Sequence, residues 1–307
     1  MRHLTTLMDV SRDDVLAIFQ LAAELKTQTR AGERPPLLQH KVLTQIFEKP
    51  SLRTRLSFES AAVHLGGQSS FFNSRDAGMH GRESLHDIAK VASSLSDFVV
   101  LRTYSQETIN DFAKWSSCPV INGLSDDHHP CQALTDLFTI QEHFGKLDGQ
   151  HLVFVGDGNN VATSLAMLCA QLSMPMTLVC PPGYEIKPSI VRELISRFPS
   201  AEFKQTQNYR SAVKNADIVY TDVWTSMGQE DEADVRKKDF NGFQVNEELM
   251  ALSKPSCRFM HDLPARRGQE VTDGVIDGEQ SIVFQQAENR MHLAKGLLVW
   301  LDRRRLK

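Results

Sequence analysis

The chain has 307 residues, of which 41% are hydrophobic and 23% are charged, and it carries a formal net charge of −4 at pH 7. This composition is typical of a soluble globular protein, and the length fits two domains of about 150 residues each. A mildly acidic chain gives no reason to expect nucleic acid or an anionic membrane surface as a partner. The five cysteines lack ligand or disulfide spacing, which argues against a zinc site and favours a reducing compartment. No apolar run approaches the roughly 18 residues that cross a bilayer, so we expect a soluble cytoplasmic protein.

The first half of the chain alternates short apolar runs with helical patterns. Ser11 to Asp14 has the capping-box pattern that starts an amphipathic helix. Strands separated by helices are typical of a mostly parallel sheet flanked by helices, which predicts the α/β fold class. The expected helices cover 11–29, 53–65, 84–95 and 106–115, and the expected strands cover 42–47, 69–72, 98–101 and 119–121.

The second half repeats this organisation after a break. A long helix is expected from Pro130 to Phe144, and the glycines that follow it mark a boundary between a first domain, 1–145, and a second domain, 146–307. Leucines and other apolar residues at helical spacing predict a final helix over 287–301. The other strands are expected at 151–155, 176–180, 218–221 and 258–261, and the other helices at 160–172 and 187–198.

Residues 47–55, Phe-Glu-Lys-Pro-Ser-Leu-Arg-Thr-Arg, bring anion-binding groups to the start of an expected helix. Hydroxyls and backbone N–H groups at a helix N-terminus favour negative charge, and the forked guanidinium of arginine matches phosphate oxygens. Ser51, Arg53, Thr54 and Arg55 therefore indicate a phosphate cradle. Taken alone, the segment reads equally well as a serine N-cap followed by two solvated arginines.

Two further motifs point to the same ligand. Arg102 ends an apolar run and could reach an oxygen that becomes anionic when a carbonyl is attacked. His129 and Gln132 lie one turn apart at the start of the long helix and could face one small ligand. Each motif alone reads more often as a surface arginine or an ordinary helix start, but their order and spacing together indicate one site.

A glycine turn at Gly156 to Asn160 follows the expected strand 151–155. A strand, a glycine turn and a helix in this order also occur in dinucleotide-binding proteins. The third glycine of that pattern is missing, and Cys180-Pro-Pro stands where an acidic residue should end the second strand. These differences argue against an oxidoreductase.

Together these motifs resemble the aspartate/ornithine carbamoyltransferase family over nearly the whole chain, from about residue 3 to 303. The family signature is Ser-Thr-Arg-Thr-Arg, and Leu52 here replaces its first Thr. The resemblance implies that the final helix, 287–303, packs back on the first domain. It also implies a carbamoyl-phosphate site made by Ser51, Leu52, Arg53, Thr54, Arg102, His129, Gln132, Leu263 and Arg290.

The segment from Asp222 to Gly228 resembles the family's ornithine-recognition loop, whereas the aspartate-specific members have a more basic loop there. The resemblance implies that Asp222 pairs with an amino group of the acceptor and that Ser226 and Met227 hold its carboxylate and amine. Asn160 carries over as a further acceptor contact. We therefore expect ornithine as the acceptor.

Two departures from the family pattern concern this site. Ornithine-specific members have Cys where His-Asp-Leu-Pro, 261–264, has Asp262, and that thiol contacts the δ-amino group in the family. Asp222 and Asp262 together would raise the pKa of the bound amine, unless the two carboxylates share a proton. The second departure is Gly78, where family trimers often carry a Gln or His that reaches the neighbouring subunit's site.

The resemblance implies transfer of the carbamoyl group of carbamoyl phosphate to L-ornithine, giving L-citrulline and phosphate in arginine metabolism. Arg102, His129 and Asp262 would be the catalytic residues. The reaction needs no metal or organic cofactor, and a homotrimer is implied. Asp262 and Gly78 leave two alternatives open, namely a transferase for a modified acceptor such as an N-acylornithine or a diamine, and a non-catalytic carbamoyl-phosphate-binding paralogue.

Overall fold

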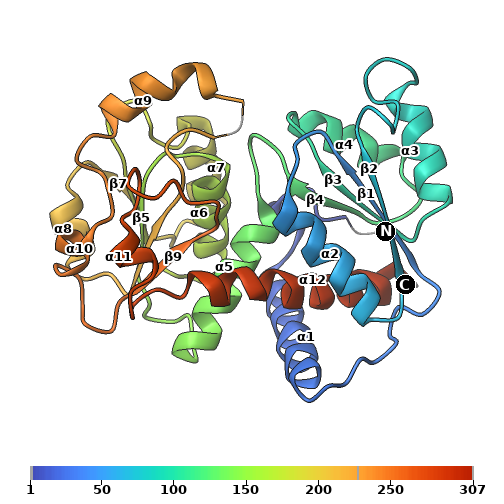
Figure 1. The fold of residues 1–307 in the computed structure, drawn as a ribbon, viewed down its shortest axis with the longest axis horizontal. Coiled ribbons are helices and arrows are strands. Elements are labelled where there is room, and N and C mark those ends of the chain that lie inside the picture. The colour runs from blue at the N-terminus through green and yellow to red at the C-terminus, as the bar shows by residue number, and fades with distance from the viewer. Residues whose placement is uncertain (1–2, 227, 306–307) are drawn as a thin grey trace. The chain divides into compact units, whose positions relative to one another are not determined.

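The computed structural model describes residues 3–226 and 228–305, and the chain folds into two compact units. Unit 1 comprises Met1–Phe138 and Glu288–Lys307, and unit 2 comprises Thr139–Ala287. The chain passes between the units twice, each time within a helix, first α5 (Pro130–Phe144) and then α12 (Val283–Arg305) (Figure 1). The α/β fold class, with two mostly parallel sheets flanked by helices, is confirmed. None of the described helices is long and apolar enough to cross a membrane.

Unit 1 is built on a parallel four-stranded sheet in the order β2-β1-β3-β4. α3 and α4 cover one face through a core that includes Ile88, Ile109 and Val99. α2 covers the opposite face, where a side chain at Gly123 would meet Val100 and Thr54. The carboxyl ends of all four strands lie at one edge, where the candidate phosphate-binding residues follow them. The other elements are η1 (Leu7–Asp9), α1 (Arg12–Arg30), β1 (Val42–Phe47), α2 (Leu52–His64), β2 (Gln68–Asn73), α3 (Leu85–Ser94), β3 (Phe98–Arg102), α4 (Gln106–Trp115) and β4 (Val120–Leu124).

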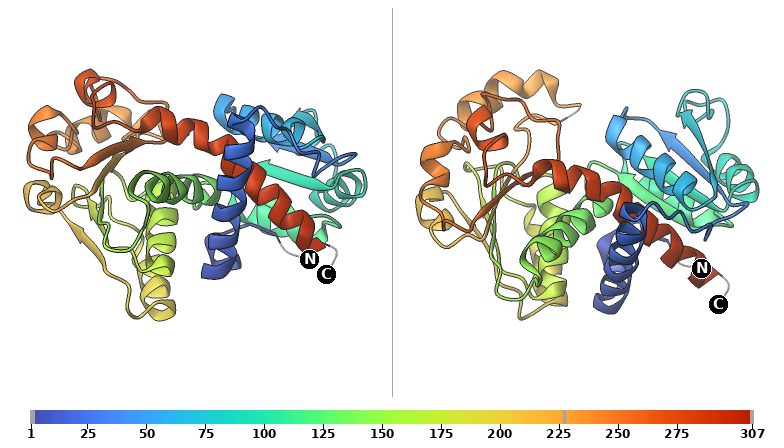
Figure 2. Two further views of the ribbon diagram at one scale, coloured as in Figure 1. Left: turned by 90° about the horizontal axis from the view of Figure 1, so that it is seen from below. Right: turned by 60° about the horizontal axis from the view of Figure 1, so that its bottom comes forward.

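Unit 2 has a parallel five-stranded sheet in the order β7-β6-β5-β8-β9. α8, α10 and α11 share a core with one face, and α6 and α7 pack against each other (Figure 2). Its elements are β5 (Leu152–Val155), α6 (Asn160–Leu172), β6 (Met176–Val179), α7 (Pro188–Arg197), β7 (Phe203–Thr206), α8 (Tyr209–Val213), β8 (Ile218–Thr221), η2 (Glu230–Glu232), α9 (Ala233–Asp239), α10 (Glu247–Met250), β9 (Arg258–His261) and α11 (Asp273–Ile276).

Most predicted elements are present with ends that differ by a few residues. The capping box of α1 is confirmed, because the Ser11 side chain accepts a hydrogen bond from Asp14 N while Asp14 caps Ser11 N. The predicted start of the last helix is wrong, since α12 begins at Val283 and runs to Arg305. Its first turn lies outside the apolar pattern, and Phe284 there is 63% exposed. β7 was not predicted because its residues, Phe-Lys-Gln-Thr, are mostly polar and form an edge strand.

Candidate functional site

The predicted cradle lies at the N-terminus of α2. Ser51 is its N-cap in an extended conformation, and the Ser51 Oγ accepts a hydrogen bond from Thr54 N at 3.2 Å. The Ser51 hydroxyl also donates to Thr54 Oγ1 at 3.0 Å. Leu52 is 70% exposed, so its side chain makes no part of a buried site and only its backbone can serve the cradle. Arg53 follows in the first turn, half-buried. Such a terminus presents backbone donors to an anion.

Arg290, from α12, ties the cradle to α5. Its guanidinium donates to Thr54 Oγ1 at 2.9 Å and to Gln132 Oε1. Gln132 in turn donates to Asp136 Oδ1 at 2.7 Å. Arg290 is only 7% exposed, and Gln132 and Asp136 are fully buried. This polar network fixes the guanidinium beside the cradle.

Arg102 and His129 complete the group in unit 1. Arg102 ends β3 and is 5% exposed, and His129 directly precedes α5 and is 4% exposed. Burial, with Arg290 and Arg102 close by, holds the pKa of His129 well below its ordinary value. His129 is therefore a neutral imidazole at physiological pH and can donate one hydrogen bond to an oxygen ligand without adding charge.

Arg55, the last residue of the motif, points elsewhere. It forms an ion pair with Glu59 at 2.8 Å and lies over the ring of Phe71, 4.0 Å from the ring centroid. Its side chain is 46% exposed. The motif therefore contains one arginine in the first turn beside the cradle and one that belongs to the surface of α2.

In unit 2, Asp222 follows β8 and is buried at 6% exposure. It accepts hydrogen bonds from Asn159 Nδ2 at 2.7 Å and from Val223 N at 2.7 Å. Asn159 is the N-cap of α6, and its own oxygen accepts from the first turn of that helix. Sequence analysis selected Asn160, which lies half-buried at the first position of α6. Asn159 is the residue that orients Asp222, and its N-cap position was the signal for it.

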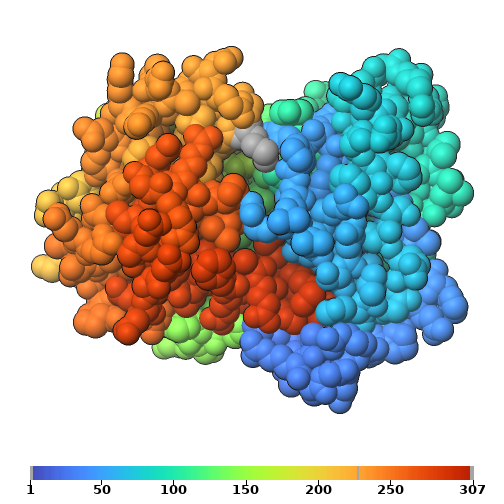
Figure 3. Space-filling view, in the orientation of Figure 1, coloured from blue at the N-terminus to red at the C-terminus, as the bar shows by residue number. Residues whose placement is uncertain are grey.

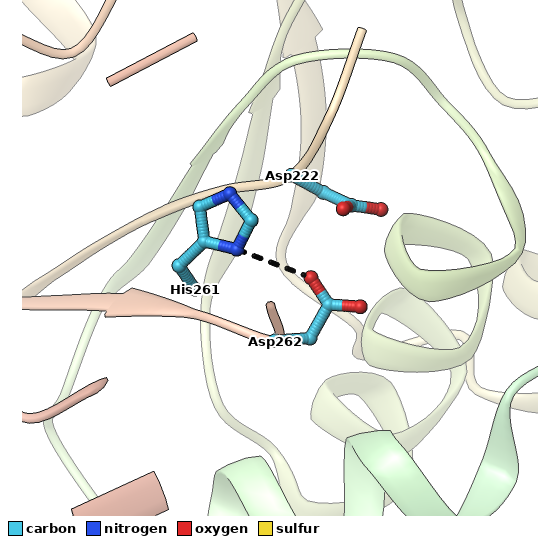
Figure 4. Close-up of side chains that lie close together, drawn as sticks. All are labelled: Asp222, His261 and Asp262. Atoms are coloured by element: carbon cyan, nitrogen blue, oxygen red, sulfur yellow. Dashed lines mark ion pairs between the residues drawn. The ribbon is translucent and has the colours of Figure 1, made fainter. Parts of the chain in front are cut away.

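Asp262 and His261 lie beside Asp222, as Figure 4 shows. One oxygen of each carboxylate and one ring nitrogen of His261 lie within 4.8 Å of one another, and His261 Nδ1 is 3.5 Å from Asp262 Oδ1. Burial raises the pKa of Asp222 well above its ordinary value, and Asp262 raises it further. Two carboxylates this close favour sharing one proton.

Glu270 contacts His261 on the side of the ring that faces away from Asp262, and sequence analysis did not identify it. Its carboxylate lies 3.3 Å from His261 Nε2, and both side chains are fully buried. Burial disfavours the His261 cation, but hydrogen bonds with Asp262 and Glu270 outweigh it and raise the pKa of His261 to about 9. A buried acid nine residues beyond the motif leaves no pattern in the sequence.

The histidine is poorly suited to hold a metal ion. His261 Nδ1 lies 2.9 Å from Leu263 N and 3.5 Å from Asp262 Oδ1, and Nε2 faces Glu270. A metal ligand needs a free imidazole lone pair, and an imidazole whose pKa is raised to about 9 by neighbouring carboxylates is protonated at neutral pH and offers none. The cluster suits an ammonium group better, because its carboxylate oxygens accept hydrogen bonds.

Leu263 lies in unit 2, with the acceptor candidates. Its φ is +61°, in the left-handed region that costs a non-glycine residue roughly 1–2 kcal/mol. Strain of this kind is concentrated at functional sites. The unusual backbone fixes the direction of the Leu263 carbonyl, which the family resemblance assigns to the carbamoyl group.

The acceptor loop is anchored by Arg236. Ser226 is half-buried, its N–H bonds Gln229 Oε1 at 3.1 Å, and Met227 lies outside the described residues. The 229–240 segment lies at the surface of unit 2 (Figure 3) and includes α9. Arg236 itself is 7% exposed and donates to Asp157 Oδ2 at 2.7 Å and to Trp224 O at 3.1 Å. It thus joins the acceptor loop to the glycine turn.

Close packing of the backbone explains the glycine at position 158 of the glycine turn. A Cβ at Gly158 would lie 2.5 Å from Ile186 N, closer than any side-chain atom can approach. Glycine is required there by close backbone contact, and the turn needs no pyrophosphate to explain it.

We expect Arg236→Ala to raise the KM for the acceptor by about tenfold, because loss of a buried charge pair lets both loops shift. The KM for the phosphate-bearing substrate should not change. Steady-state kinetics with each substrate varied in turn would measure both values. Lys238→Ala, an exposed residue of the same helix, is the matched control and should behave as the unmodified chain; an equal change in both KM values would contradict the anchoring role.

The predicted neighbour-reaching segment forms an exposed loop. Gly78 has a φ of +81°, and a side chain there would come within 3.3 Å of Glu83 Oε1. His80 Nε2 lies 2.8 Å from Ser74 Oγ within the same loop. Glycine is therefore explained by the local backbone, and the ring of His80 is the nearest candidate for the side chain that Gly78 lacks.

Comparisons with known proteins agree with this geometry. Residues 2–142 match the family model "Aspartate/ornithine carbamoyltransferase, carbamoyl-P binding domain", and residues 148–301 match "Aspartate/ornithine carbamoyltransferase, Asp/Orn binding domain". The ornithine carbamoyltransferase of Wolinella succinogenes is 45% identical over 307 residues, covering 99% of this chain and 100% of that protein. That of Anoxybacillus flavithermus is 47% identical over 302 residues, covering 98% and 96%. The solved structure of the Pyrococcus furiosus ornithine carbamoyltransferase superposes with a TM-score of 0.93 at 43% identity, covering 98% of this chain and 96% of that chain.

Proposed function

The chain belongs to the aspartate/ornithine carbamoyltransferase family, and from that premise we propose that it is an ornithine carbamoyltransferase. The reaction joins the carbamoyl group of carbamoyl phosphate to the δ-amine of L-ornithine and releases phosphate. The observation that carries the proposal is the buried network that links the α2 cradle, through Thr54, to Arg290 and Gln132.

The donor is held by the unit 1 residues. The N-terminus of α2, with Ser51, Arg53 and Thr54, binds the phosphate and stabilises the charge that grows on it as the P–O–C bond breaks. Arg102 and neutral His129 donate to the carbonyl oxygen, which becomes anionic when the amine attacks. Gln132 orients the carbamoyl NH2 group, a role that the family resemblance also assigns to the Leu263 carbonyl, so that much of the acceleration comes from positioning.

The acceptor is held by unit 2. Asp222 and Asp262 receive the δ-amino group, Asn160 supplies a further contact, and Ser226 and Met227 hold the α-carboxylate and α-amine. Asp262 replaces the family's cysteine at the reacting amine. It accepts the same hydrogen bond, so the substitution preserves acceptor binding. The proposed roles involve no metal ion or organic cofactor.

The direct test is citrulline formation from carbamoyl phosphate with a panel of acceptors: L-ornithine, N-acetylornithine and putrescine. We expect ornithine to exceed putrescine in kcat/KM by at least about a hundredfold, because putrescine leaves the donors for the carboxylate unpaired. Putrescine at equal or higher kcat/KM would overturn this interpretation of the acceptor loop. Preference for N-acetylornithine would make the chain a transferase for a modified acceptor. If no amine gave a product, the chain would be a non-catalytic carbamoyl-phosphate-binding protein.

We further propose a homotrimer that acts in the cytoplasm, in arginine biosynthesis. Leu52, Leu56 and Val63 project from one face of α2 and are 50–70% exposed, and Phe72 on the edge strand β2 is 43% exposed. Exposed apolar side chains at this density are typical of an interface. All five cysteines are buried thiols, which suits a reducing compartment.

We expect Leu56→Asp to lower the molar mass measured by light scattering after gel filtration, because a charge would be buried in the interface. Ile195→Asp places the same change on α7 at a residue that is 51% exposed, and it should leave the mass unchanged. A trimer that survives Leu56→Asp would exclude this face.

A further inference from the structure

A buried lysine crosses the strand ends that carry the donor site. Lys49 lies between β1 and the cradle, and its side chain is only 5% exposed. Its ammonium forms an ion pair with Asp126, whose side chain is 58% exposed, and lies over the Tyr104 ring, 4.5 Å from the ring centroid. A buried ammonium needs such partners, because desolvation without them is costly.

Lys49 and its two partners follow three adjacent strands. Lys49 follows β1, Tyr104 follows β3 and Asp126 follows β4, in the sheet order β2-β1-β3-β4. Neighbouring strands are about 4.8 Å apart, so the lysine spans roughly 10 Å of the sheet edge. Only a long side chain with a charged end can bridge that distance and still pair with a carboxylate.

Backbone hydrogen bonds follow the same path. Glu48 N donates to Arg102 O at 2.7 Å, and Tyr104 N donates to Glu48 Oε2 at 2.8 Å. Asp126 N donates to Tyr104 O at 2.9 Å. Asp126 then lies in the turn closed by Ser125 N and His128 O at 2.8 Å, directly before His129. Each turn that Lys49 touches therefore leads within three residues to a member of the donor site.

We propose that Lys49 is a positioning residue for carbamoyl phosphate: with Asp126 and Tyr104 it holds the turns that carry Ser51, Arg102 and His129 in one arrangement. This inference rests on the proposed function. Neutralising Asp126 distinguishes this positioning role from direct binding of the phosphate by Lys49, because the two roles change the affinity for the anion in opposite directions. Removing a negative charge near the site would strengthen binding of an anion by a direct ligand, whereas loss of positioning weakens it.

The test compares Lys49→Met, Lys49→Arg and Asp126→Asn with Lys114→Met, which removes an exposed lysine from α4. We expect Lys49→Met to raise the KM for carbamoyl phosphate by about ten- to hundredfold, with the KM for ornithine unchanged at saturating carbamoyl phosphate. Asp126→Asn should raise the same KM by a smaller factor, because its carboxylate is half in water. Lys49→Arg should recover much of the loss, and Lys114→Met should match the unmodified chain.

Three results would overturn the proposal. A lowered melting temperature with an unchanged KM in Lys49→Met would leave the lysine a purely structural ion pair. A lower KM in Asp126→Asn would make Lys49 a direct ligand. Equal changes in both substrates' KM values would remove the link to the donor site. If Lys49→Met fails to fold, the KM of Asp126→Asn for carbamoyl phosphate still distinguishes the positioning role from direct binding.

Titration calorimetry with inorganic phosphate separates this proposal from the proposed function. Phosphate affinity can be measured whether or not the unmodified chain forms citrulline. Weaker phosphate binding in Asp126→Asn supports the positioning role, whereas equal or tighter binding contradicts it.

Discussion

Replacing Arg290 with methionine should lower kcat/KM for carbamoyl phosphate by about a thousandfold, on the scale of losing a charged group that stabilises a transition state. The guanidinium donates to Thr54 and Gln132 from a position that is 7% exposed. Methionine keeps the length and much of the packing, but it removes the charge and the hydrogen bonds to two buried acceptors, Thr54 Oγ1 and Gln132 Oε1. Burial is the largest cause of the low pKa of His129, so that imidazole should stay neutral in the variant, and the loss should not depend on pH between about 7 and 8.

Arg55→Ala is the matched control for a charge loss in the same region. Arg55 pairs with Glu59 at the surface of α2, and exposed ion pairs contribute little. We expect its kcat/KM to stay within about threefold of the unmodified value, with gel filtration to verify the assembly. The assay is steady-state citrulline formation with carbamoyl phosphate varied. An Arg290→Met enzyme within tenfold of the unmodified chain would remove Arg290 from the donor site.

The cradle was predictable because its determinants are local. A proline, a serine N-cap and a threonine within five residues specify a helix start wherever the rest of the chain lies. The strands at 42–47 and 218–221 were predictable for the same reason, since short apolar runs bounded by polar residues define them.

The contacts that complete the site were not predictable, because they join distant parts of the chain. Thr54 and Arg290 are separated by 236 positions. Family resemblance supplied Arg290, but only the structure gives its bonds to Thr54 and Gln132. Lys49 looked like an ordinary residue before a proline, and its partner Asp126 is 77 positions away.

Asp262 illustrates a different limit. The sequence left open whether Asp222 and Asp262 would both be charged or would share a proton. The structure places their oxygens in one cluster and raises the pKa of buried Asp222 well above its ordinary value, which favours the shared proton. The Asp222–Asp262 pair then carries one negative charge, as does a pair of one carboxylate and a neutral thiol.

The same cluster predicts that Asp222→Asn makes the protein more stable at high pH while it destroys acceptor binding. The folded-state pKa of Asp222 is raised above its unfolded value of about 3.9. Such a group contributes stability that is present below the unfolded pKa and is lost as pH rises through the folded pKa, because the native state then binds more protons than the unfolded state. Asparagine cannot ionise, so it avoids this loss.

We therefore expect the melting temperature of Asp222→Asn, relative to that of the unmodified chain, to increase by at least about 2 °C between pH 5 and pH 8, a shift that roughly 1 kcal/mol produces in a protein of this size. The hydrogen bond that Asn159 gives to Asp222 is disturbed equally at both pH values, so it cancels in this comparison. The KM for ornithine should rise by more than about a hundredfold, since the buried partner of its ammonium is lost.

Asp277→Asn is a control of opposite sign. Its exposed carboxylate has a pKa that is lowered by the hydrogen bond from Arg267, so its stabilising effect is present above the unfolded pKa and is lost as pH falls. Its relative melting temperature should therefore not rise between pH 5 and pH 8. The change in melting temperature of Asp262→Cys between pH 5 and pH 8 should lie between those of the unmodified chain and Asp222→Asn. Removing the neighbouring carboxylate lowers the pKa of Asp222, while burial still raises it. A relative melting temperature for Asp222→Asn that stays constant or falls from pH 5 to pH 8 would show that Asp222 is ionised throughout, and the two carboxylates would then present two charges to the amine.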